Sequence, residues 1–82
     1  MSADFTPGAN TKASQRAAIL AALQQKPLST IVARESLSVL HPAGRIMELR
    51  RAGHAIATLS QVVYDAAGQP HRSALYVLGV AP

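Results

Sequence analysis

The first part of the chain carries apolar residues at helical spacing. One stripe is formed by Ile19, Leu20 and Leu23. The surrounding residues, 15–24, are rich in alanine and leucine, which are strong helix formers. Thr11 or Ser14 can cap the N-terminus of this helix. Pro27 ends it, because the residue before a proline avoids helical geometry.

The next segment, residues 28–37, predicts a second and shorter helix. Ser29 or Thr30 can cap it. Two adjacent β-branched residues near its start make a strand a competing interpretation. The cap and the following alanine, arginine and glutamate favour the helix. Residues 38–40 then form a brief connector, in which Leu40 is expected to be buried.

The stretch between His41 and His54 has a clear start and a clear stop. Pro42 suits the first helical position, where its missing N–H costs nothing. Gly53 suits the position after the end, where a left-handed conformation closes the helix. These signals predict a third helix over residues 42–52, with His41 as its N-terminal cap.

Beyond the third helix the composition changes to that of strands. Residues 54–64 and 72–78 are rich in valine, isoleucine, leucine and tyrosine, and residues 65–70 contain the Asp, Gly and Pro of a turn. Val62 and Val63 interrupt the alternation of the first strand, and a bulge there is one remedy. An isolated hairpin is marginal in water, so this one is expected to pack on the helices.

The predicted order, three helices followed by a two-stranded β-hairpin wing, is the α+β plan of a winged helix-turn-helix domain. The short connection between the second and third helices suits a helix-turn-helix pair. With 82 residues there is room for one domain. We expect it over residues 13–79, after a flexible arm at residues 1–12 and before a tail at residues 80–82.

Charge adds a class of partner to this picture. Eight lysines and arginines against four acidic residues give a net charge of +4 with neutral histidines, and a pI near 10.4. A basic balance favours polyanions such as nucleic acid, although many small proteins are mildly basic. No apolar run approaches the ~20 residues that span a membrane. Residues 1–11 lack the pattern of a signal peptide, so a cytoplasmic protein is expected.

Three segments carry a more specific signal: SQRAAIL at 14–20, HPAGRIMELRRAG at 41–53 and HRSALYVL at 71–78. In these the chain resembles the small helix-turn-helix domains that are common in phage and prophage proteins. The resemblance covers about residues 14–78. It implies a winged-helix fold and DNA binding. The capped basic third helix, the hairpin and the net charge lead us to expect sequence-specific binding of double-stranded DNA, as in a small transcriptional regulator or an accessory DNA-binding protein.

The third helix is the expected reader of the major groove, since the N-terminal part of a recognition helix meets base edges. Its candidate contacts lie away from the core or on the flanks: Gly44, Arg45, Met47, Glu48, Arg50 and Arg51. Arginine can pair with guanine, and glutamate can accept from cytosine. As an alternative, Glu48 pairs with Arg45 or orients Arg51 on the helix surface. Arg45 and Arg50 could also bridge to Glu35.

Further candidates lie on the wing and on the second helix: Gln69, His71 and Arg72 near the wing tip, and Thr30 and Arg34 on the helix. The wing residues can contact phosphates or the minor groove. The second-helix residues can contact phosphate, because a helix start presents free N–H groups. The alternatives are a solvated hairpin tip and simple helix capping.

Little in the chain predicts catalysis or a bound group. There is no cysteine, the three histidines are far apart, and the four acids form no paired site. No Ser-His-Asp set or glycine-rich phosphate loop is present. We therefore expect no enzyme, metal, cofactor or small-molecule substrate. The expected partner is double-stranded DNA, with a homodimer left open because many DNA readers dimerise.

A second function is compatible with the same fold. A winged helix can act as a protein-interaction module that does not read DNA, and it would then expose an apolar patch. Met47, Leu59 and Val63 could supply that patch. Binding of single strands or RNA is less favoured, because aromatic residues make up only 4% of the chain.

Overall fold

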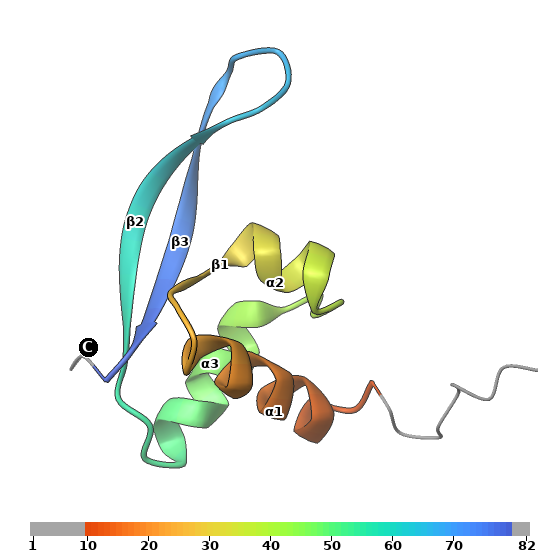
Figure 1. Cartoon of the computed structure of the whole chain (residues 1–82), viewed down its shortest axis with the longest axis vertical. Helices are drawn as coiled ribbons and strands as arrows, with labels where there is room; N and C mark the ends of the chain where they lie inside the picture. Colours follow the sequence, from red (N-terminus) through yellow and green to blue (C-terminus); the bar gives the residue numbers. More distant parts are fainter. Residues whose placement is uncertain (1–9, 80–82) are drawn as a thin grey trace, which may run out of the picture.

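A computed structural model of the protein describes residues 10–79. Its elements are, in order, α1 (Lys12–Leu23), β1 (Leu28–Ser29), α2 (Thr30–Ser36), α3 (Pro42–Arg51), β2 (Ile56–Tyr64) and β3 (Pro70–Leu78). Figure 1 shows the helices gathered beside one part of a long β2–β3 hairpin, whose tip projects beyond them. Residues 1–9 of the expected arm and the expected tail at 80–82 lie outside the described residues.

The first two helices begin at side-chain caps. The Thr11 hydroxyl accepts a hydrogen bond from the Ser14 backbone N–H at 3.1 Å. The Ser29 hydroxyl accepts one from the Val32 backbone N–H, also at 3.1 Å. Both capping residues have extended backbone torsions, which aim the hydroxyl at the first helical turn. The structure thus selects Thr11 and Ser29 from the two pairs of candidate caps.

Helix α3 begins and ends differently. His41 occupies the N-cap position as predicted, and its carbonyl accepts a hydrogen bond from the Arg45 backbone N–H at 3.3 Å. It has φ −125° and ψ 70°, outside the conformation of the other caps, and its side chain makes no capping hydrogen bond. Pro42 at the first helical position has no N–H to satisfy. At the other end Gly53 has φ +104°, as expected for the residue that closes a helix.

The sheet has three strands rather than the two that the sequence predicts. The missed strand is β1, which pairs antiparallel with β3 through Leu28 opposite Tyr76 and Ser29 opposite Leu75. The strand order is β1-β3-β2. Two residues are too few to show any alternation, and Ser29 also caps α2, so the sequence assigned the segment to the helix start. The α+β class is as expected, with this strand added.

The β2–β3 ladder runs without interruption from Ile56 opposite Leu78 to Tyr64 opposite Pro70. There is therefore no bulge at the paired valines of β2. The alternation is lost there because that part of the hairpin extends past the helices (Figure 1), where both faces can meet solvent.

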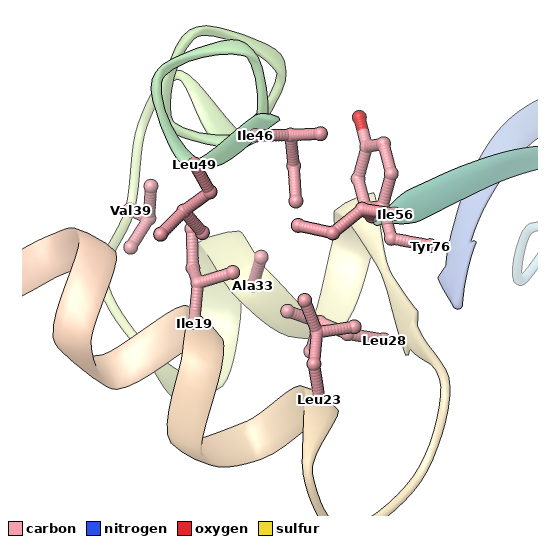
Figure 2. Packing of buried hydrophobic residues seen from close by; sticks show 9 residues of the cluster. All are labelled: Ile19, Leu23, Leu28, Ala33, Val39, Ile46, Leu49, Ile56 and Tyr76. Carbon is pink, nitrogen blue, oxygen red and sulfur yellow. The ribbon is translucent and has the colours of Figure 1, made fainter. Parts of the chain in front are cut away.

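The core lies between the three helices and one face of the sheet (Figure 2). Its buried members are Ile19, Leu23, Leu28, Ala33, Val39, Ile46, Leu49, Ile56 and Tyr76. Every helix and strand contributes at least one of them. In the connector before α3, Val39 is fully buried, whereas Leu40 is 72% exposed. The expectation that Leu40 is buried is therefore wrong, because its neighbour fills the interior position.

Candidate nucleic-acid interface

Helix α3 turns one face to the core and the opposite face to solvent. Ile46 and Leu49 are 1% and 5% exposed and point into the cluster of Figure 2. On the other side Met47 is 49% exposed and Arg51 is also exposed. Gly44 lies one turn before Met47 and two turns before Arg51, and it is half-buried. Three of the predicted contacts, Gly44, Met47 and Arg51, thus share one outward face.

The flank of α3 that faces α1 carries a charge cluster. The Glu48 carboxylate accepts a hydrogen bond from Arg16 Nη1 at 2.8 Å and another from Arg45 Nη2 at 3.0 Å. Arg45 Nη1 also donates to Gln15 Oε1 at 3.4 Å, and its side chain is only 11% exposed. The predicted alternative, a pair between Arg45 and Glu48, is formed. Both residues therefore face α1 instead of the outward face of α3.

These arginines also fix the charge state of the carboxylate. The hydrogen bond from Arg16 and the positive charge of Arg45 hold the pKa of Glu48 below its usual value, against the opposing effect of desolvation. Glu48 is therefore ionised at neutral pH. Each of its oxygens already accepts from an arginine, which leaves it poorly placed to accept from a base.

The other flank of α3 is tied to β2. Arg50 Nε donates to the Ile56 carbonyl at 2.7 Å, and Arg50 Nη2 donates to Thr58 Oγ1 at 2.6 Å. These bonds hold the C-terminal end of the helix against the start of the wing. In the described part of the chain neither Arg45 nor Arg50 forms the predicted bridge to Glu35.

Arg51 differs from the other arginines of α3. It forms no hydrogen bond or ion pair with any residue that the structure describes, and Glu48 does not orient it. Its guanidinium is exposed at the end of the outward face. All five of its N–H donors are therefore free to meet a partner.

The two predicted contacts on α2 have structural partners. Thr30 Oγ1 lies 3.5 Å from the Ala74 carbonyl, a long hydrogen bond between α2 and β3. Arg34 Nε donates to the Leu40 carbonyl at 3.4 Å and remains exposed. Arg34 keeps its full charge, since a carbonyl does not neutralise it.

The wing tip is organised by one carboxylate. Asp65 Oδ1 accepts from the backbone N–H groups of Ala67 and Gln69, both at 2.9 Å, and Oδ2 lies 2.8 Å from His71 Nε2. The hydrogen bond with His71, followed by the one from the Gln69 backbone, lowers the pKa of Asp65. Of the predicted wing contacts, His71 therefore holds the turn with its side chain, whereas Gln69 does so only through its backbone N–H.

Arg72 is the exposed cation of the wing. Its Nη1 donates to Ser60 Oγ at 3.2 Å, across the hairpin, and no carboxylate of the described residues pairs with it. The predicted residues thus form separate groups: the outward face of α3, the cluster between α1 and α3, and the wing. Sequence reasoning missed Arg16 as a partner of Glu48, because a pair 32 positions apart leaves no local signal.

The described residues contain neither a metal-ligand cluster nor a membrane-spanning helix. Among them no three His, Asp or Glu side chains come together as a metal site would require. Within residues 10–79 no helix combines the length and the apolar character needed to cross a bilayer.

No curated protein and no solved structure matches the chain. A family model described as a winged helix-turn-helix domain matches residues 14–81, which includes every helix and strand except the first two positions of α1. The order α1-β1-α2-α3-β2-β3, with α2 and α3 joined by a short turn, agrees with that match. The chain belongs to the winged helix-turn-helix domain family, whose members generally bind DNA.

Proposed function

We propose that the chain binds double-stranded DNA in a sequence-specific manner, with α3 in the major groove and the wing on the backbone or in the minor groove. The observation that carries this proposal is the outward face of α3, which ends in Arg51, a side chain with no partner among residues 10–79. A recognition helix has to expose such a face and hold it rigidly.

The contacts around α3 supply that rigidity. The helix is held by its core residues on one side, by the cluster around Glu48 towards α1, and by Arg50 towards β2. Arg72 on the wing and Arg34 on α2 are exposed cations suited to phosphate. The net charge of +4 favours the encounter with DNA.

The biological role follows from the resemblance of three segments to phage and prophage domains. We infer a small transcriptional regulator or accessory DNA-binding protein that acts in the cytoplasm by binding, with no catalytic step. Two chains on two related half-sites would fit a short recognition face. A selected DNA site with two-fold symmetry and a complex of two chains per duplex would identify a homodimer.

The test is a titration of labelled duplex DNA with the full chain at several salt concentrations. Affinity should fall steeply with salt, by about 0.9 in log–log slope for each phosphate contacted. Arg51→Ala should weaken binding. Lys26→Ala is the matched control, since it removes from the connection between α1 and β1 an exposed cation that forms no ion pair with a described residue. Absence of binding to any duplex at low salt would refute the proposal.

A protein-interaction module is the second candidate function. The exposed apolar side chains favour it: Leu40 is 72% exposed, Leu59 is 51% and Met47 is 49%. Met47 lies on the face of α3 assigned to DNA, and Leu40 lies in the connector just before that helix. The same titration separates the two functions, because an interaction module leaves duplex DNA unbound at every salt concentration.

A further inference from the structure

We propose that α3 recognises thymine methyl groups in the major groove through Met47, and this inference rests on the DNA binding proposed above. The reason is the chemistry of the outward face. The residues exposed along its N-terminal part are Ala43 and Met47, with Gly44 between them half-buried. None of these side chains donates or accepts a conventional hydrogen bond.

The charged residues next to this face on α3 do not supply the missing hydrogen-bonding groups. Arg45 is 11% exposed and paired with Glu48, whose second oxygen is held by Arg16. Arg50 is bound to the Ile56 carbonyl and to Thr58. The polar pairings that would select guanine or cytosine are therefore engaged within the protein. Arg51 is the exception, and it lies at the C-terminal end of the helix.

Gly44 provides an independent observation. A Cβ atom at this position would meet nothing within 4 Å, and its backbone is helical, so neither packing nor backbone geometry requires a glycine. Glycine inside a helix lowers helix stability relative to alanine. A glycine that the fold does not need is explained by close approach of another molecule to α3 beside Met47.

The apolar group of the major groove is the C5-methyl of thymine. A methionine side chain is flexible and polarisable, so it can adapt to such a methyl group. Ala43 can contribute a second, smaller apolar contact. The structure therefore points to a recognition site that contains thymine where the N-terminal part of α3 lies.

The test begins with selection of duplexes from a random-sequence pool by the full chain. In the selected duplex each thymine is then replaced in turn by uracil, which keeps base pairing and the O4 acceptor and removes only the methyl group. We expect at least one replacement to weaken binding about fourfold, which corresponds to the ~0.8 kcal/mol of one buried methylene-sized group.

Two variants assign the effect to a residue. Met47→Ala, at an exposed position, should bind the thymine and uracil duplexes equally well. Arg51→Ala should weaken binding to both and keep the thymine preference. Circular dichroism of each variant checks that the fold is retained.

The outcomes separate this inference from the proposed function. If the wild-type chain binds duplex DNA but no thymine responds to replacement, or if selection yields no site with thymine, the inference is overturned and DNA binding stands. The same holds if Met47→Ala keeps the preference. If the wild-type chain binds no duplex at low salt, the proposed function itself fails.

Discussion

At the scale of single residues, Glu48 decides which side chains of α3 remain free. It accepts hydrogen bonds from Arg16 of α1 and Arg45 of α3. Two candidate DNA contacts, Arg45 and Glu48 itself, are thereby held in a structural cluster. The local half of this arrangement could be predicted, because Arg45 and Glu48 are three positions apart. The other half depends on how α1 packs on α3, which no local spacing reveals. Arg51 has no bond to Glu48, because both oxygens of that carboxylate already accept from other arginines.

The Glu48 cluster should make stability depend on pH. Since the pKa of Glu48 is lowered in the folded state, its pairing stabilises the fold above the unfolded pKa, and this contribution is lost as the pH falls through the folded value. Glu48→Gln should therefore lower the free energy of unfolding at neutral pH. The difference from wild type should vanish in strong acid.

Urea denaturation at neutral pH and at about pH 2 measures this change. Glu35→Gln is the matched control, because it removes an exposed carboxylate of α2 that is in no ion pair of the described residues. A Glu48→Gln deficit of equal size at both pH values would contradict the assigned role.

At the scale of elements, the ends of helices could be predicted and the short strand could not. Caps at Thr11 and Ser29 and the glycine after α3 each leave a local signature. Strand β1 has two residues and exists because β3 supplies its hydrogen-bonding partner. Its existence is a tertiary effect. The exposure of Leu40 is also a tertiary effect. Val39 and Leu40 are adjacent and both apolar, and packing alone decides that Val39 fills the interior.

The glycine inside α3 and the glycine that follows its end should respond to alanine substitution with opposite changes in stability. Gly44→Ala should stabilise the fold by up to about 1 kcal/mol, because the helix gains and a Cβ meets open space. Gly53→Ala should destabilise it by about 1–2 kcal/mol, because φ is +104° there. Thermal unfolding of both variants measures these changes.

DNA affinity adds a second readout for Gly44→Ala. The added methyl group occupies the space assigned to the DNA, so this variant should bind duplex DNA more weakly although it is more stable. A variant that is more stable and binds as well as wild type would refute close approach at Gly44.

The wing has its own prediction. Arg72 is exposed and pairs with no carboxylate within residues 10–79, so we expect it to contact phosphate. Arg72→Ala should weaken binding to all duplexes alike and reduce the salt slope by about one unit. Anisotropy titrations with several duplexes measure both quantities. A changed preference among sequences, with an unchanged slope, would assign Arg72 to base reading.

At the scale of the whole molecule, one core joins every element and fixes α3 relative to the wing. Side chains from three helices and three strands meet around Ile19 and Ile46 (Figure 2). The order of elements was enough to predict the α+β class. The separation of the candidate contacts into distinct groups was not predictable, because it depends on packing between segments far apart in sequence.

Because the core is small, a minor change within it should be felt. Ile46→Val should lower the free energy of unfolding by about 0.5–1.5 kcal/mol, since it removes one methyl group from a fully enclosed position. Met47→Ala, at the next residue but half exposed, should change it by less than about 0.5 kcal/mol. Equal effects in urea denaturation would contradict the division of α3 into a buried and an outward face.

The central claim is that α3 presents its outward face, together with the wing, to duplex DNA. A backbone NMR titration of the full chain with a duplex tests it most directly. The account predicts shifts concentrated at residues 43–51 and near Arg72, with Gly44, Met47 and Arg51 among the most affected. Shifts confined to the sheet around the exposed Leu59, away from α3, would contradict it, as would the absence of shifts at low salt.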